Sequence, residues 1–175
     1  MKLKSFAKLN LSLLVFRPRK KDGYHPLCSV FQTISLYDEL NIKILPHQKG
    51  VFKLRCSNPE VPVDEKNLLT KLYLRLKAKI PFGLQIYLKK NIPMGGGLGG
   101  GSSNAAVFLQ FLNQYVPLNY TKKQLVSFAL SFGADIPFFL EGGTSLVRGI
   151  GEKLKSIKPG PYKYFVLINP QLHLD

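Results

Sequence analysis

Residues 93–104 read Pro-Met-Gly-Gly-Gly-Leu-Gly-Gly-Gly-Ser-Ser-Asn, with six glycines in seven consecutive positions. An alternating strand pattern with Leu84, Ile86 and Leu88 on one face precedes them, and a helix-forming apolar run follows from Ala105. Because glycine lacks a Cβ atom, a ligand can approach the backbone closely and positive φ angles cost little. The unpaired N–H groups of the following helix N-terminus attract an anion. We therefore predict a phosphate-binding loop rather than a flexible linker.

The loop does not fit two common nucleotide-binding motifs. A Walker A loop ends in Gly-Lys-Ser/Thr, whereas Ser102 follows Gly101 here. A dinucleotide-binding fingerprint needs an acidic residue about 20 positions further on, and Tyr120 and Thr121 occupy that region. The phosphate charge must therefore be met by backbone amides, by serine hydroxyls and by lysines.

Length and composition limit the class of protein. The chain has 175 residues, of which 45% are hydrophobic, so one domain can bury a core. No apolar run is long enough to span a membrane, and the N-terminus lacks the features of a signal peptide. Cys28 and Cys56 match neither a disulfide framework nor a metal site. These features predict a cytoplasmic protein with reduced cysteines.

The charge balance suggests a competing function. The chain has 25 Lys and Arg against 10 Asp and Glu, a formal net charge of +15. A basic surface favours polyanions, so a basic RNA-binding module is the alternative that we weigh against nucleotide binding. The basic residues are widely spread, however, with one dense cluster at residues 17–21. This spread disfavours nucleic acid.

Hydrophobic periodicity predicts an α+β fold, a mixed sheet packed with helices. Strands are expected at Lys8–Val15, Val30–Leu36, Leu40–Leu45, Val51–Arg55, Leu84–Lys89, Thr144–Val147 and Tyr164–Ile168. Helices are expected at Asn67–Lys79, at Ser103–Tyr115, and from Thr121 to near Gly133, the last opened by a Thr-x-x-Gln capping box.

Polar residues outside the loop are candidates for chemistry. Strand alternation places Lys8 and Asn10 on one face, opposite the leucines. A turn contains Asp-Gly-Tyr-His at residues 22–25, and Asp135 follows a predicted helix end. Each of these features alone also has an ordinary structural explanation, such as a solvated strand face or a turn cap.

Taken in order along nearly the whole chain, these segments resemble a known family. Ala7–Leu11, Asp22–His25, Pro93–Ala106 and Gly133–Pro137 look like successive motifs of the 4-diphosphocytidyl-2-C-methyl-D-erythritol kinase family. This family belongs to the GHMP kinase superfamily and acts in the non-mevalonate route to isoprenoids. The resemblance implies a GHMP-kinase N-terminal lobe at residues 1–160, with a fold like the second domain of ribosomal protein S5. It also implies ATP-dependent phosphorylation of the 2-hydroxyl of a cytidine diphosphate substrate.

The resemblance further implies a role for each motif. Asp135 would accept the proton of the substrate hydroxyl, and Lys8 would steady that aspartate and the transferred phosphoryl group. Magnesium would arrive with ATP, and its protein ligands stay open, as does the oligomeric state. The substrate would contact Asn10, Tyr24, His25 and Phe31. ATP would contact Pro93, Met94, Gly95, Gly96, Gly97, Leu98, Gly99, Gly100, Gly101, Ser102 and Ser103, with its adenine near Asn67 and Lys89.

One departure from the family concerns length. Members of the family continue into a second lobe, of which residues 161–175 would form the start. That lobe carries a third glycine-rich motif and a second aromatic residue for the cytosine. We therefore expect the 175 residues alone to turn over little or not at all. An inactive nucleotide-binding remnant is the third alternative.

Overall fold

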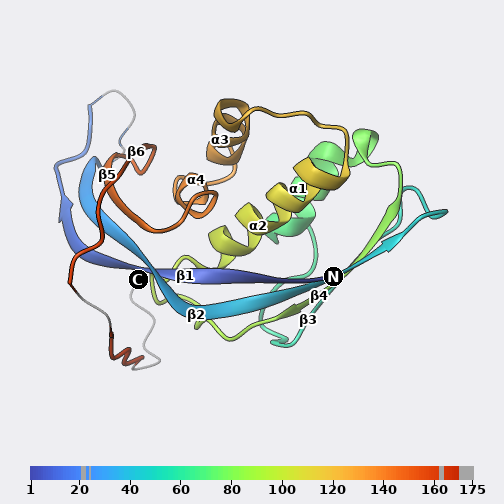
Figure 1. Ribbon diagram of the computed structural model, residues 1–175, viewed down its shortest axis with the longest axis horizontal. Helices are drawn as coiled ribbons and strands as arrows, with labels where there is room; N and C mark the ends of the chain where they lie inside the picture. The colour runs from blue at the N-terminus through green and yellow to red at the C-terminus, as the bar shows by residue number, and fades with distance from the viewer. Residues whose placement is uncertain (21–22, 24, 162–163, 170–175) are drawn as a thin grey trace.

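The computed structural model describes residues 1–20, 23, 25–161 and 164–169 and shows a mixed sheet with helices on one face (Figure 1). This arrangement confirms the predicted α+β class. The elements are, in order, β1 (Lys2–Val15), β2 (Leu27–Leu45), β3 (Phe52–Cys56), α1 (Leu68–Leu76), the 3₁₀ turn η1 (Lys77–Lys79), β4 (Gly83–Lys89), α2 (Gly100–Tyr115), α3 (Lys122–Leu130), α4 (Ile136–Phe139), β5 (Thr144–Gly149) and β6 (Lys153–Ser156).

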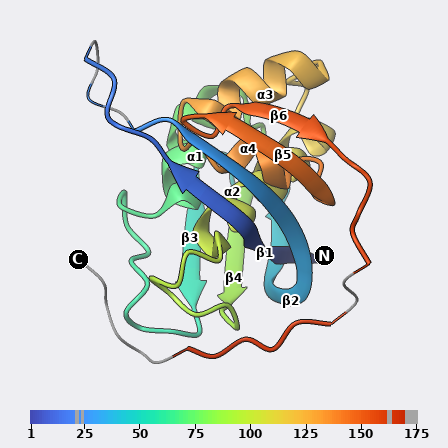
Figure 2. The ribbon, with the colours of Figure 1, turned by 90° about the vertical axis from the view of Figure 1, so that its left-hand side faces the viewer.

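Strand β2 organises the sheet. It pairs with β1 along one edge, while its other edge pairs with β5 over residues 27–32 and with β4 over residues 39–45. Strand β3 adds parallel to β4, to which α1 connects it, and β6 adds antiparallel to β5. Because β4 and β5 occupy different ends of one edge, the middle of β2 is free to face the glycine loop. Figure 2 shows this long curved strand beside β1.

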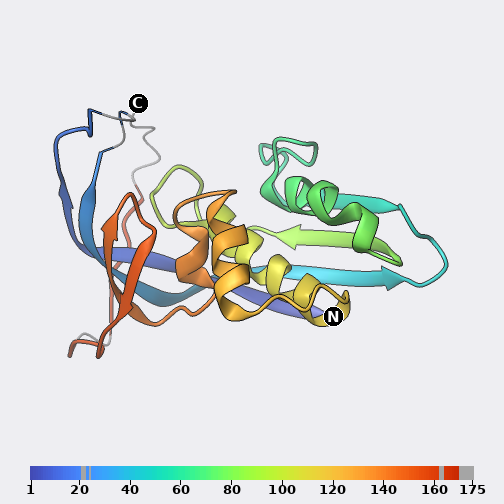
Figure 3. The same cartoon turned by 90° about the horizontal axis from the view of Figure 1, so that it is seen from above.

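The core lies between the sheet and the helices. Helix α2 is its centre, and it buries Ala105, Ala106, Phe108, Leu109 and Leu112 against β1, α1 and α4. Seen from above, α1 covers β3 and β4, whereas α3 and α4 lie toward β5 and β6 (Figure 3). Burial of these apolar side chains contributes most of the stabilising free energy.

Six of the seven predicted strand segments lie in strands, but several of their bounds are wrong. The segments predicted at Val30–Leu36 and Leu40–Leu45 form one strand, because the polar pair Asp38 and Glu39 continues the ladder instead of breaking it. Strand β1 begins at Lys2, and register shifts after Phe6 and Asn10 interrupt its alternation. The predicted leucine face is consequently not buried, since Leu13 is half exposed.

The later part of the chain also departs from prediction. The capping box of Thr121 and Gln124 is present, but α3 ends at Leu130, and Gly133 does not adopt the positive φ expected of a helix C-cap. Helix α4 and strand β6 were not predicted. The strand predicted at Tyr164–Ile168 is wrong, because residues 164–168 form no strand and Tyr164 and Val166 are exposed. The lobe boundary near residue 160 stays a prediction.

Two expectations about the class of protein can be compared with the described residues. Within residues 1–20, 23, 25–161 and 164–169, no helix combines the length and apolar character needed to span a bilayer. Cys28 and Cys56 are both free thiols, which agrees with the expectation of reduced cysteines.

Candidate nucleotide-binding and phosphoryl-transfer site

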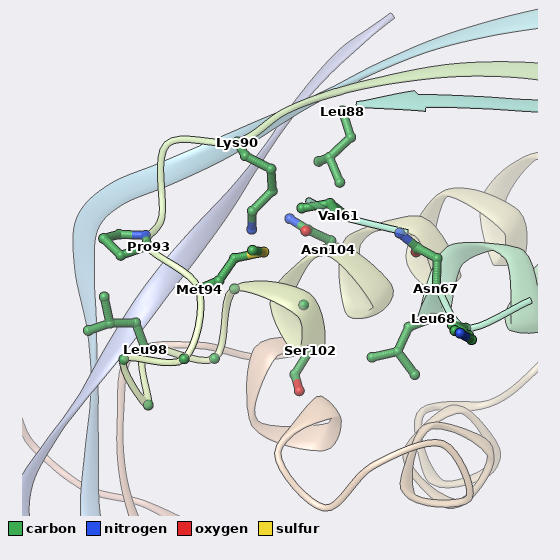
Figure 4. A pocket seen from close by; sticks show the side chains of 17 residues that line it. Val61, Asn67, Leu68, Leu88, Lys90, Pro93, Met94, Leu98, Ser102 and Asn104 are labelled. Carbon is green, nitrogen blue, oxygen red and sulfur yellow. The ribbon is translucent and has the colours of Figure 1, made fainter. Parts of the chain in front are cut away.

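A cavity of about 390 Å³ opens in front of the glycine loop. The side chains of Val61, Leu68, Leu88 and Met94 give it an apolar wall, while Lys90, Asn104 and Ser102 add polar atoms (Figure 4). Such a mixture suits an aromatic base at one end and a polar group at the other. Most of the predicted loop residues line this cavity: Pro93, Met94, Gly95, Gly96, Gly97, Leu98, Gly99, Gly100, Gly101 and Ser102.

The backbone of the loop needs its glycines. Gly95, Gly97 and Gly99 adopt left-handed φ angles of 73°, 66° and 70°, which residues with a Cβ rarely adopt. Gly99 is also the N-cap of α2. The first backbone amides of this helix have no partner within the helix, and they belong to residues that line the cavity, among them Gly100 and Gly101. Alternating left-handed residues of this kind make concave amide nests that bind anions.

Gly99 additionally brings the loop against the polar residues of the site. A Cβ at this position would lie 2.5 Å from the Phe139 ring and 3.4 Å from Cγ of Lys8. The backbone N–H of Lys8 also donates a 3.0 Å hydrogen bond to the carbonyl oxygen of Leu98. The loop and β1 are therefore joined directly at Lys8.

Lys8 and Asp135 lie together, as the sequence predicts. The Lys8 ammonium is 3.9 Å from Oδ2 of Asp135, and it donates a 2.8 Å hydrogen bond to Oδ1 of Asn10. Lys8 and Asn10 therefore do share a face. Asp135 is the N-cap residue of α4, but its carboxylate makes no capping bond and is 35% exposed, so it faces the site.

The environment of Lys8 is electrostatically unusual. Its side chain is only 4% exposed, and its ammonium lies 4.4 Å from the centre of the Phe31 ring. Burial lowers the pKa of Lys8 below its ordinary value, because desolvation disfavours the ammonium more than Asp135 favours it. Phe31 is itself buried and packs edge-on against Phe138, so it supports Lys8 from behind.

The predicted cytidine-binding turn lies at the tip of the β1–β2 hairpin. Nδ1 of His25 is 3.0 Å from the carbonyl oxygen of Phe16, which closes the hairpin just beyond the last β1–β2 pair. His25 is six positions before Phe31 in the sequence, or roughly 20 Å along an extended strand. Tyr24 lies outside the described residues. The structure thus brings Lys8, Asn10, Phe31 and Asp135 together, with His25 further along the same hairpin.

Three predicted ATP contacts have other roles in the structure. Asn67 lines the cavity, but its amide caps α1 at the Leu69 N–H and bonds the Pro62 carbonyl. Lys89 is not among the cavity residues and lies 3.9 Å from Glu39, and the neighbouring Lys90 takes its place. Ser103 is buried and lines a separate hollow behind the loop.

Sequence reasoning missed Asp38, which lies beneath the loop. Its carboxylate is fully buried and bonds Lys90, Asn104 and the backbone after β4. The available signal was a lone acidic pair inside a long run of strand-forming residues. A charged side chain at such a position is either solvated or paired. Because the two predicted strands left this pair between them, the possibility that Asp38 is buried and paired was not considered.

The described residues contain no cluster of protein ligands that could bind a metal ion without a bound substrate. Among residues 1–20, 23, 25–161 and 164–169, no three His, Cys, Asp or Glu side chains cluster closely enough to bind an ion. Asp135 is a single half-exposed carboxylate in front of the loop. One carboxylate fits magnesium that is carried mainly by phosphates, which is how this ion usually binds.

Comparison with known proteins defines the class. The profile of the GHMP kinases N terminal domain matches residues 67–143, which include α1, β4, the glycine loop, α2 and α4. The structure also superposes on a mevalonate kinase from Methanococcus jannaschii with a TM-score of 0.61 at 16% identity, a likeness of fold alone. The chain therefore contains the N-terminal domain of the GHMP kinases, and its fold is that of this domain.

Within this class, the resemblance is to one kind of kinase. The chain is 41% identical to 4-diphosphocytidyl-2-C-methyl-D-erythritol kinase of Clostridium botulinum (strain Alaska E43 / Type E3) and 42% identical to that of Syntrophus aciditrophicus (strain SB). Both matches cover 97% of this chain and 60% of the relative, so the chain spans about three fifths of their length. A crystal structure of 4-(cytidine 5'-diphospho)-2C-methyl-D-erythritol kinase superposes with a TM-score of 0.73 at 39% identity, covering 90% of this chain and 55% of the other. These relatives do not favour the RNA-binding alternative.

Proposed function

We propose that the chain binds ATP and forms the phosphoryl-transfer half of a kinase that phosphorylates 4-diphosphocytidyl-2-C-methyl-D-erythritol on its 2-hydroxyl. One observation carries the proposal. Lys8 bonds the glycine loop through its backbone, and its ammonium lies 3.9 Å from Asp135. A base, a counter-charge and a phosphate-binding loop are therefore adjacent. The names of relatives about 40% identical support the choice of substrate.

The proposed mechanism depends mainly on positioning and charge. Phosphoryl transfer needs little covalent help from a protein, so fixed amides and cations that hold the phosphates supply most of the catalysis. Asp135 would accept the substrate proton, because its carboxylate makes no capping hydrogen bond and is 35% exposed. Lys8 would stabilise the charge that develops on the transferred group. Asn10 would hold the Lys8 ammonium between Asp135 and the transferred group, because its Oδ1 accepts a 2.8 Å hydrogen bond from Lys8.

The remaining roles extend from this centre. The apolar wall of Val61, Leu68, Leu88 and Met94 would hold the adenine, and the loop would hold the phosphates. Asp135 is the carboxylate in front of the loop that would face magnesium bound with ATP, and the ion would supply neutralisation of the phosphate charge. Cytidine recognition is proposed for Tyr24 and His25 at the hairpin tip.

A matched pair of glycine variants tests ATP binding on the 175-residue chain. Gly97 and Gly50 both adopt left-handed φ angles, 66° and 85°, with open space around the missing Cβ. Alanine at either position should therefore cost a similar ~1–2 kcal/mol of folding stability. Only Gly97→Ala should also weaken the binding of a non-hydrolysable ATP analogue, measured by isothermal titration. Equal affinity in both variants would show that the loop is not the ATP site.

The catalytic assignment needs a chain extended to the relatives' full length. Asp135→Asn should reduce turnover by roughly a hundredfold or more while ATP still binds, because the amide cannot accept the hydroxyl proton. Glu141→Gln is the control, since Glu141 is half exposed and pairs with Lys122 at the surface. Retention of wild-type turnover by Asp135→Asn would rule out Asp135 as the base.

A further inference from the structure

Asp38 occupies a special place in the sheet. It lies in β2 next to Glu39, which forms the last β2–β4 pair with Lys89. Beyond this pair the chain leaves the sheet and enters the glycine loop. Asp38 is 0% exposed, so its carboxylate lies beneath the start of the loop with no access to water.

One carboxylate holds both ends of the loop. Oδ1 of Asp38 accepts hydrogen bonds from the backbone N–H groups of Asn91 at 2.7 Å and Ile92 at 2.8 Å. Oδ2 accepts from the Lys90 ammonium and, at 3.0 Å, from Nδ2 of Asn104 in the first turns of α2. The same Asn104 amide also donates to Ser5 of β1 at 2.6 Å. The loop is thereby tied to β1 and β2 before and after its glycines.

Lys90 needs this partner because of its location. Its side chain is 8% exposed and lines the cavity, beside Asn104 in Figure 4. A Cβ on Gly100 would lie 3.0 Å from the Lys90 ammonium, so this cation is close to the N-terminus of α2. A helix N-terminus is itself partly positive and repels a cation. The buried carboxylate offsets both the desolvation of Lys90 and this repulsion.

We propose that Asp38 is a positioning residue for the nucleotide, an inference that rests on the proposed ATP binding. It holds the Lys90 ammonium in the cavity and fixes the two ends of the loop. The positive charge and the loop amides are then already in place when ATP arrives. Preorganisation of this kind raises affinity, because less ordering remains to be done on binding.

The test is Asp38→Asn on the 175-residue chain. Asparagine keeps an oxygen for the amides of Asn91 and Ile92, but it presents an NH₂ group to Lys90 and Asn104, which are themselves donors. Glu39→Gln is the matched control, because the neighbouring Glu39 pairs with exposed Lys89 and loses the same charge. We expect the Kd for an ATP analogue to rise about tenfold in Asp38→Asn, on the scale of one charged hydrogen bond. Glu39→Gln should stay within about twofold of wild type.

A double-mutant cycle with Lys90→Gln separates positioning from mere folding stability. If Asp38 acts through Lys90, Asp38→Asn should weaken binding much less in the Lys90→Gln background than in wild type. Additive losses, or a lower melting temperature with an unchanged Kd, would overturn the proposal. If wild type itself does not bind ATP, the proposed function fails first.

A second measurement needs no variant at Asp38. The side-chain ammonium resonances of lysines report fixed, slowly exchanging NH₃⁺ groups by NMR, and Lys90→Gln assigns the signal. Lys90 should give a resolved signal that shifts on addition of the ATP analogue, while that of exposed Lys89 should not. A Lys90 signal that is averaged with solvent, or that ATP leaves unchanged, would contradict the proposal even if Asp38→Asn does not fold.

Discussion

Lys8 illustrates how a functional residue is kept at a cost to stability. Its ammonium is buried against the Phe31 ring, and Asn10 and the more distant Asp135 offset part of the lost hydration. The lowered pKa of Lys8 means that the charged form is disfavoured in the folded state relative to the unfolded chain. The proposed role in phosphoryl transfer nevertheless requires a cation at this point. The residue therefore serves the site more than the fold.

This conflict gives a prediction for Lys8→Met. Methionine removes the desolvation penalty of the buried ammonium, while Asp135, which is 35% exposed, keeps contact with water. We expect Lys8→Met to unfold in urea at pH 7 with a free energy equal to or above that of wild type. Lys89→Met is the control at an exposed lysine and should have little effect.

The difference in unfolding free energy between wild type and Lys8→Met should change with pH in one direction only. Between the lowered folded pKa of Lys8 and its unfolded value of 10.5, the unfolded chain binds more protons than the folded protein. Stability of wild type relative to Lys8→Met must therefore rise with pH through this window. A gap between the two proteins that widens as pH rises would contradict the burial of a charged Lys8.

Several residues of the site were predictable because their signals are local or belong to a motif. Lys8 and Asn10 share a face by simple strand alternation, and the glycines need only their lack of a Cβ. Asp38 was not predictable in this way. Its partners come from the segment between β4 and the loop and from α2, up to 66 positions away. Only the folded sheet brings these donors to one carboxylate.

At the scale of elements, the turn between β5 and β6 packs against the segment that carries Asp135. Gly151 in this turn has a φ of 119°, and a Cβ there would lie 3.0 Å from Cβ and 3.3 Å from the carbonyl oxygen of Ala134. Ala134 immediately precedes Asp135. Since β6 was not predicted from the sequence, this contact was not predicted either. The short strand therefore helps to set the position of Asp135.

We expect Gly151→Ala to push the Ala134–Asp135 segment away from Lys8. In a chain extended to the relatives' length, kcat should fall roughly tenfold or more while the affinity for ATP stays close to wild type, because misplacement of a reacting group by about 1 Å is costly. Gly143→Ala is the control: its φ is 76° and its missing Cβ faces open space. Equal losses of kcat in both variants would point to general strain instead.

Element boundaries show where sequence patterns are weakest. Helix α2 begins at Gly100, three residues before the predicted start, because packing and the loop geometry override the low helix propensity of glycine. Strand β2 runs through Asp38 and Glu39 because both residues pair with β1 and Glu39 also pairs with β4. In each case tertiary contacts outweigh the local preference that the prediction used.

At the scale of the whole molecule, two segments expose large apolar side chains to solvent. Leu13, Leu14, Val15 and Phe16 on the β1 arm are half exposed or more, and so are Tyr164, Val166 and Ile168 after β6. Exposed apolar side chains of this kind can bind another part of a protein or another molecule. About two fifths of the relative's length lies outside the matched part.

The last stretch of the chain allows a direct test of this interpretation. Exposure alternates strongly along it, at 92%, 40%, 92%, 41% and 84% for residues 164–168, a period of two like that of a strand, although these residues form no strand in the structure. We expect the amides of Tyr164, Val166 and Ile168 to exchange with deuterium within seconds in the 175-residue chain. In a chain extended to the relatives' full length, they should be protected by at least about a hundredfold, because strand pairing then buries them.

The amides of β4 serve as the control and should be protected in both chains. Fast exchange at residues 164–168 in the extended chain would mean that this segment is a linker and not the first strand of a further unit.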